Sequence, residues 1–224
     1  PGNSAYQHDL TSCFARLGNL ARAQGDLDAA RRDYADGVDI LRRLVERDPH
    51  DPRYRHDLMS WCDEFGDLAA ADGDLEAARA FHGISHDSRR WLAEQEPGNR
   101  DHQFKVALSY AKLAAHATAE GDWEASRRLA LHRLEIAREL VAAEPGNSAY
   151  GVELADGYGD LGDVAQTTGD TRAARIWHEQ ALDLRRELAE REPADVSHRQ
   201  NLHVSYTQLG DLARIDGDLD LARN

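Results

Sequence analysis

Apolar and polar residues follow one another along this chain with the spacing of α-helices. Between residues 6 and 23 the apolar side chains fall three and four positions apart, which is typical of one face of a helix. A second stretch with the same spacing runs from residue 27 to residue 45, and turn-forming residues separate the two. The pattern therefore predicts two antiparallel helices of about 20 residues, each roughly 30 Å long.

A Gly-Asp pair separates the two predicted helices. Glycine reaches the left-handed conformation that ends a helix without steric cost, and the aspartate carboxylate caps the N-terminus of the next helix. The pair returns every 48 residues, and its glycines are Gly25, Gly73, Gly121, Gly169 and Gly217. A proline keeps the same period, at Pro1, Pro49, Pro97, Pro145 and Pro193. The pair of helices is therefore the unit of a repeat.

The fixed period predicts the fold class and the domain organisation. Each unit of such an array buries apolar surface only against its neighbours, so the units stack. We expect an all-α fold, a right-handed α-solenoid of antiparallel helix-turn-helix repeats. The repeats are residues 1–48, 49–96, 97–144 and 145–192, with a partial fifth at 193–224, and all belong to one solenoid domain.

The first repeat carries the residue pattern of a known family. The matching residues are Leu17, Gly18, Ala21, Gly25, Asp26, Ala30, Tyr34, Gly37 and Pro49. Over its whole length the chain resembles the tetratricopeptide-repeat family, whose usual period is about 34 residues. The spacing from Gly18 to Gly25 is that of the family, and the stretches before and after it are each about seven residues longer. The chain thus resembles a long-helix variant.

The resemblance implies a scaffold that binds a protein or peptide in the concave face lined by the first helices. By the family's register this face is acidic and has an apolar patch in the third repeat. Its predicted contact residues are Asp63, Asp67, Phe104, Leu108, Ala111, Asp156, Asp163 and Asp211, with Ala115 completing the patch. A basic peptide or helix with a central apolar anchor would fit such a groove.

Composition narrows the classes of partner. The net charge is −14, from 27 Lys and Arg against 41 Asp and Glu, which disfavours nucleic acid and anionic membrane surfaces. No long apolar run predicts a membrane span. The two cysteines, Cys13 and Cys62, form no Cys-x-x-Cys pattern and are expected to be small buried hydrophobes. We expect a cytoplasmic, bacterial-type protein, and a chain that starts without Met and stops early in a repeat reads as part of a longer one.

Candidate chemistry is sparse. The chain has no Gly-x-Ser-x-Gly elbow, no phosphate-binding P-loop and no dinucleotide fingerprint, so we expect neither an enzyme nor a cofactor. His82 and His86 stand four residues apart and would put two imidazoles on one face of a helix, as in some zinc sites. The glutamate of the zinc-protease motif is absent between them, and a third ligand would have to come from another helix. No metal site is therefore predicted.

Two other functions remain open at this point. Long-helix repeats of this kind resemble those of bacterial signalling proteins, where they accompany ATPase or protease-like domains, so the array could be a regulatory sensor. A partial fifth repeat leaves an apolar helix face uncovered, and that face could pair with a second copy of the chain in a homo-oligomer.

Overall fold

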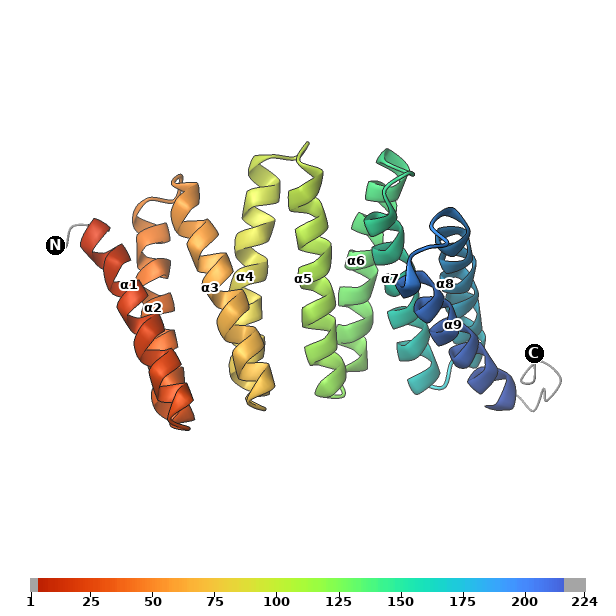
Figure 1. Ribbon diagram of the computed structural model, residues 1–224, viewed down its shortest axis with the longest axis horizontal. Coiled ribbons are helices and arrows are strands. Elements are labelled where there is room, and N and C mark those ends of the chain that lie inside the picture. Colours follow the sequence, from red (N-terminus) through yellow and green to blue (C-terminus); the bar gives the residue numbers. More distant parts are fainter. Residues whose placement is uncertain (1–3, 216–224) are drawn as a thin grey trace. The chain divides into compact units, whose positions relative to one another are not determined.

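The computed structural model describes residues 4–215, and all the regular structure in this range is helical (Figure 1). The helices are α1 (Ser4–Ala23), α2 (Leu27–Arg47), α3 (Pro52–Ala71), α4 (Leu75–Gln95), α5 (Arg100–Ala119), α6 (Trp123–Ala143), α7 (Ser148–Thr167), α8 (Thr171–Arg191) and α9 (Val196–Ile215). The first helices of successive repeats begin at residues 4, 52, 100, 148 and 196, so the helices keep the 48-residue period of the sequence.

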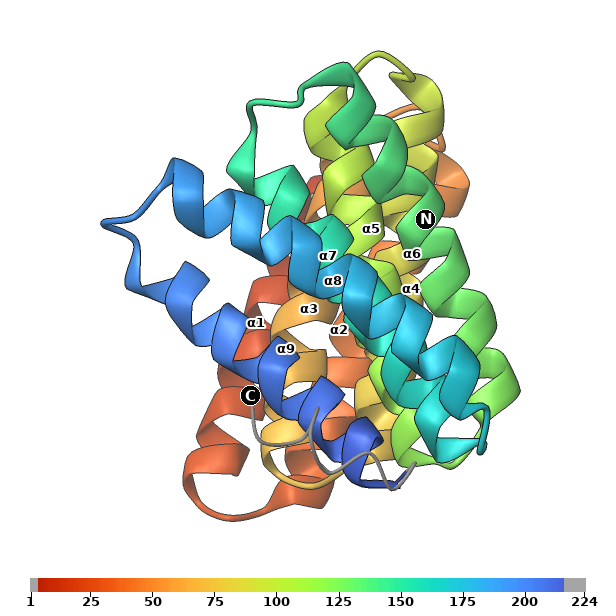
Figure 2. The same ribbon diagram turned by 90° about the vertical axis from the view of Figure 1, so that its right-hand side faces the viewer.

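The chain divides into two compact units, residues 1–97 and 98–224. The boundary falls between the second and third repeats. In the first unit α1 and α2 form one hairpin and α3 and α4 the next, and α2 packs against α3. In the second unit α5 to α9 pack in succession, and α5 also contacts α7. Figure 2 shows α8 and α9 lying alongside each other in this unit. Such consecutive packing of hairpins is the arrangement of an all-α solenoid.

The predicted junction between the helices of a repeat is confirmed in four repeats. The four glycines have φ angles of 79°, 83°, 76° and 85°, and they are Gly25, Gly73, Gly121 and Gly169. After each of them the aspartate side chain accepts a hydrogen bond from the backbone N–H three residues on, as Asp26 does from Ala29 at 2.9 Å. The fifth pair, at Gly217, lies outside the described residues.

Small residues on the first helices make room for rings on the second helices. A Cβ atom added at Gly18 would overlap the ring of Tyr34, and one added at Gly66 would overlap the ring of His82. The same holds for Gly162 and His178. Large side chains therefore pack against small ones between the helices of a hairpin in both units.

The core of the first unit centres on Phe65, which is 1% exposed. Tyr34 stacks on it with ring centroids 4.0 Å apart, and Phe81 contacts it edge-on at 6.0 Å. Cys62 lies in the same cluster, and burial raises the pKa of its thiol to about 12. Cys13 is exposed, so the prediction that both cysteines are buried is wrong for it. The reason is that α1 packs mainly against α2, which covers only one side of it.

The apolar face predicted for residues 6–23 is only partly a core face. Tyr6 is 73% exposed, and Leu10 and Leu17 are also exposed. Their counterparts one repeat later include Leu58 and Phe65, which are buried because α2 covers that side of α3. No described helix precedes α1, so the same side of α1 has no cover within the described part of the chain.

None of the described helices has the length and apolar character that crossing a membrane requires.

Candidate functional site

The predicted contact residues fall into both units. Asp63 and Asp67 lie on α3 in the first unit. In the second unit the residues lie on three first helices: Phe104, Leu108 and Ala111 on α5, Asp156 and Asp163 on α7, and Asp211 on α9. The helices α5 and α7 are in contact, and Ala111 of the apolar patch lines the same hollow as Asp163 of α7.

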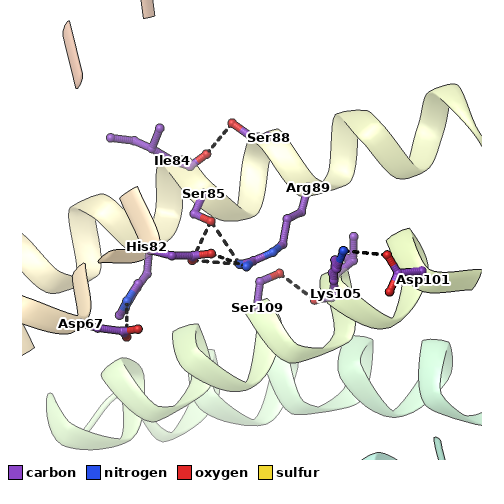
Figure 3. A network of polar contacts seen from close by, with 11 residues as sticks. Asp67, His82, Ile84, Ser85, Ser88, Arg89, Asp101, Lys105 and Ser109 are labelled. Carbon is purple, nitrogen blue, oxygen red and sulfur yellow. Dashed lines mark hydrogen bonds and ion pairs between the residues drawn. The ribbon is translucent and has the colours of Figure 1, made fainter. Parts of the chain in front are cut away.

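In the first unit both predicted carboxylates are held by the second helix of their own hairpin. Asp63 accepts hydrogen bonds from Ser85 at 2.8 Å and from Arg89 at 3.0 Å. Asp67 lies 3.1 Å from Nε2 of His82 (Figure 3). Figure 3 shows Ser85 and Arg89 pointing toward the same carboxylate and His82 pointing toward Asp67. Asp63 and Asp67 therefore connect α3 to α4.

The two histidines considered as metal ligands are both buried in α4. His82 packs on Gly66 and turns its Nε2 to Asp67. Among residues 4–215, three side chains that could share a metal ion occur together only at Glu192, Asp195 and His198. His82 and His86 are thus not part of such a group in this range.

The group at Glu192, Asp195 and His198 is accounted for by the junction between α8 and α9. Glu192 is the C-cap residue of α8 and lies 3.2 Å from Nε2 of His198. Asp195 accepts a hydrogen bond from the backbone N–H of Ser197 at 2.8 Å. Hydrogen bonds lower the pKa of both carboxyls, from Ser148 and His198 to Glu192 and from Ser197 to Asp195. His198 stands at the register position of Tyr150, so its role is to pack this junction.

A buried ion pair that was not predicted from the sequence connects α6 to α7. Nε and Nη2 of Arg133 donate to the two carboxylate oxygens of Glu153 at 2.7 and 3.0 Å, and Nη1 donates to Asp160. Arg133 and Glu153 are 5% and 4% exposed. Burial alone would lower the pKa of Arg133, but the hydrogen bonds and charges of Glu153 and Asp160 outweigh it and raise that pKa. The sequence indicates that Arg133 is unusual, because the same register position holds the small residues Gly37, Ser85 and Ala181 in the other repeats.

The predicted α7 carboxylates also have partners on neighbouring helices. Asp156 accepts a hydrogen bond from Arg185 on α8 at 2.8 Å. Asp163 accepts one from Gln208 on α9 at 2.9 Å and lies 3.7 Å from Nε2 of His178, which is too long for a hydrogen bond. Burial raises the pKa of Asp163 and lowers the pKa of His178, so burial disfavours the charged form of each.

The carboxylates on α7 exceed the cations that face them. Four carboxylates, those of Glu153, Asp156, Asp160 and Asp163, meet two guanidinium groups, those of Arg133 and Arg185. Burial raises the pKa of Asp160, as it does that of Asp163. When the four carboxylates are ionised and His178 is neutral, the two guanidinium groups balance two of the negative charges and two remain.

A hollow of about 440 Å³ adjoins this cluster, between α5, α6 and α7. Alanine and threonine side chains form most of its α5 wall, and Arg133, Asp160 and Asp163 stand on the α6 and α7 side. Its lining residues are Ala111, Ala114, Ala115, Thr118, Ala119, Trp123, Ser126, Arg133, Asp160, Asp163, Val164 and Thr167. Ala111 and Ala115 occupy the register positions of Asp63 and Asp67.

The rest of the predicted apolar patch continues along α5. Leu108 is 40% exposed, and Phe104 is half-buried with its ring centroid 5.3 Å from that of Tyr150. With Ala111 and Ala115, these residues form an apolar strip beside the negative α7 cluster. This combination suits binding, since it offers apolar surface and unbalanced charge.

Two segments of the chain match the family model described as tetratricopeptide repeat, at residues 10–51 and 154–195. They occupy equivalent positions in the first and fourth repeats. The comparison with curated proteins gave no match.

Several solved structures are similar to the chain. BtubC (BKLC) from P. vanneervenii is 18% identical with a TM-score of 0.60, and the match covers 98% of this chain and 84% of that one. MamA is 17% identical with a TM-score of 0.46, covering 95% and 85%. TTC0263, a tetratricopeptide-repeat protein of Thermus thermophilus, is 17% identical with a TM-score of 0.33, covering 94% of each chain. At 18% identity the likeness to BtubC concerns the fold alone.

The two matched repeats lie in an all-α fold of consecutive helical hairpins. The residues that carry the repeat pattern do what the family requires of them, since the glycines end the first helices and the small residues admit the rings of the second helices. Residues 10–51 and 154–195 therefore match the tetratricopeptide repeat in sequence, within an all-α fold of helical hairpins.

Proposed function

We propose that this chain is a non-catalytic interaction module and that it binds a protein or peptide on the face of its first helices. Tetratricopeptide-repeat proteins generally mediate interactions between proteins, and this is the coarse function that the family carries. The observation that favours a particular surface is the apolar strip on α5 lying next to the unbalanced carboxylates on α7.

The apolar strip supplies the surface whose burial would drive association. Leu108 and Ala115 are exposed on α5, and Ala111 is half-buried between them. They follow one another at intervals of three and four residues, so a partner helix or extended segment can contact all of them at once. Apolar area removed from water contributes roughly 25 cal/mol per Å².

Charge selects the kind of partner. The α7 cluster has two more carboxylates than guanidinium groups, and the chain carries a net charge of −14. A basic partner gains from this field both in encounter rate and in specificity. An acidic partner would meet repulsion. We therefore propose a basic peptide or protein segment with an apolar anchor.

A peptide-display selection tests this proposal. The whole chain is immobilised and offered a random library of 16-residue peptides in buffer of about physiological ionic strength, where exposed charges are screened beyond about 8 Å. Recovered peptides should carry Lys or Arg within one helical turn of a large apolar residue. Recovery of acidic peptides, or of none above an unrelated acidic helical protein, would contradict the proposal.

A further inference from the structure

We propose that the hollow between α5, α6 and α7 is an anchor pocket. Its occupant is one large apolar side chain of a peptide partner, and a Lys or Arg of the same peptide lies against Asp163. This inference rests on the proposed function and specifies where and how the partner is anchored.

The size of the hollow suits a single anchoring side chain. Its volume of about 440 Å³ lies in the range of sites that hold small ligands. The α5 wall consists of short side chains, and those of Ala115 and Thr118 are exposed at the mouth. A Leu- or Phe-sized group can therefore enter without displacing a bulky residue.

The third repeat, where the hollow lies, differs from the other described repeats at three register positions, two of which line the hollow. The second helices of the other described repeats place a ring against the first helix, at Tyr34, His82 and His178. In the third repeat the same position is Ala130, and the facing glycine is replaced by Ala114. Ala115 stands where Asn19, Asp67 and Asp163 stand in the other repeats. The third repeat thus lacks both the ring and its polar partner on the first helix.

The hydroxyl groups of the lining have partners of their own. Thr118 and Ser126 share a hydrogen bond of 2.7 Å, and Thr167 donates to the backbone carbonyl of Asp163 at 2.8 Å. These hydroxyl groups keep their hydrogen bonds when an apolar group enters the hollow, so removing water from them costs little free energy. The wall accordingly accepts an apolar occupant.

The charges on the other wall select a cation. Arg133 is committed to Glu153 and Asp160 and is 5% exposed, so it offers little to an anion. The Asp163 side chain is 58% exposed at the pocket and belongs to the cluster with two uncompensated carboxylates. An incoming ammonium or guanidinium group can form a charge-assisted hydrogen bond with this exposed carboxylate. The pocket therefore combines an apolar interior with an anionic rim.

Three small probes test this assignment on the whole chain. They are phenethylammonium, phenethyl alcohol and 3-phenylpropionate, which share an aromatic ring and differ in charge. Binding is followed by the ¹³C-methyl NMR signals of Ala111 and Ala119, both in the lining. Phenethylammonium should shift these signals with an affinity about threefold or more above that of the alcohol, as expected for an exposed charge contact. The carboxylate should bind least.

Three variants complete the test. Ala115→Leu fills the mouth and should abolish the shifts, whereas Ala142→Leu, at an exposed alanine of α6 outside the hollow, should leave them unchanged. Asp163→Asn, which can still accept from Gln208, should remove the preference for the ammonium. Shifts that persist in Ala115→Leu, equal binding of the three probes, or no shift with any of them would overturn the assignment.

Peptide binding to the Ala115→Leu variant distinguishes failure of this inference from failure of the proposed function. If peptides recovered by display bind Ala115→Leu as tightly as wild type, the interaction module stands and the anchor pocket is wrong. If phenethylammonium binds as described and display yields no peptide, the pocket stands and the proposed function fails.

Discussion

At the scale of single residues, the helices of one hairpin approach closely where a ring of the second helix lies on a glycine of the first. The ring also finds a polar partner one residue further along the first helix. Tyr34 donates its hydroxyl to Asn19 at 2.8 Å, and His82 lies 3.1 Å from Asp67. The contact therefore couples a steric requirement for glycine to a polar interaction.

The steric part predicts opposite effects for two glycines of the first unit. Gly66→Ala should lower the free energy of unfolding by about 1–3 kcal/mol, because the added methyl overlaps the buried ring of His82. Gly83→Ala should raise it by about 1 kcal/mol, because nothing lies within 4 Å of the new methyl and alanine favours the helix. Urea unfolding of both variants measures this. Equal effects of the two substitutions would contradict the packing.

The pairing of a buried ring with a polar group predicts that the stability of the fold depends on pH through His178. Burial lowers its pKa in the folded state, so the unfolded chain binds the proton more readily and this residue costs stability as pH falls below about 6.5. Asp163 has the opposite effect at more acidic pH. Its pKa in the folded chain is raised above 3.8, so the folded chain binds the proton more readily than the unfolded chain. The stability of the fold therefore rises as pH falls toward 3.8.

Transplanting the pair of the first repeat isolates the histidine. The double variant His178→Tyr with Asp163→Asn installs the counterparts of Tyr34 and Asn19. Between about pH 7.5 and pH 6.0 the urea midpoint of the double variant should fall less than that of wild type. The reason is that position 178 then carries no imidazole that could be protonated. A fall as large as that of wild type would show that His178 does not contribute to the acid sensitivity.

At the scale of elements, buried arginines connect one helix to the next. Arg133 joins α6 to α7 through Glu153, and Arg185 on α8 contacts both Asp156 on α7 and Ser205 on α9 at 2.8 and 2.7 Å. A buried charge that loses its partner is costly, whereas an apolar pair of similar volume is tolerated. A substitution that removes one member of such a contact should therefore destabilise the fold, whereas replacing both members by apolar residues should cost less.

A double-mutant cycle measures the α6–α7 contact. Arg133→Met should destabilise the chain by about 3–5 kcal/mol, because Glu153 then stays buried without its guanidinium. Adding Glu153→Leu should restore much of the loss. If the double variant is no more stable than the single one in urea unfolding, Glu153 does not depend on Arg133.

Local features of this fold could be predicted from the sequence, and contacts between helices could not. The caps at Gly25 and Asp26 follow from the residues themselves, because the conformation and the hydrogen bond are local. The exposure of Leu17 could not be predicted, because periodicity identifies an apolar face but not whether another helix covers it. The partners of Arg133 depend on which faces of α6 and α7 meet, and one sequence does not contain that information.

The candidate site shows the same division. The apolar strip and the α7 acids followed from the register of the family, and the structure places both in the second unit. The pairing of Asp156 and Asp163 with Arg185 and Gln208 did not follow, since it depends on packing of α7 against α8 and α9. The hollow lies in the repeat that has Ala130 where the other described repeats have a ring, and this difference is visible only when the repeats are compared.

At the scale of the whole molecule, each unit is a set of hairpins whose first helices carry the proposed binding face. The face of the second unit combines the α5 strip with the α7 cluster, and two leucines allow it to be tested. Leu108 on α5 is 40% exposed, and Leu131 on α6 is 41% exposed. A carboxylate introduced at either position should cost similar stability, but only the one on α5 lies in the proposed face.

The most direct measurement is the affinity of a display-selected basic peptide for wild type, Leu108→Asp and Leu131→Asp, by isothermal titration. Leu108→Asp should weaken binding about tenfold or more, as loss of an interface anchor residue does, and Leu131→Asp should bind like wild type. Equal affinities for all three proteins, or a loss confined to Leu131→Asp, would contradict binding on the face of the first helices.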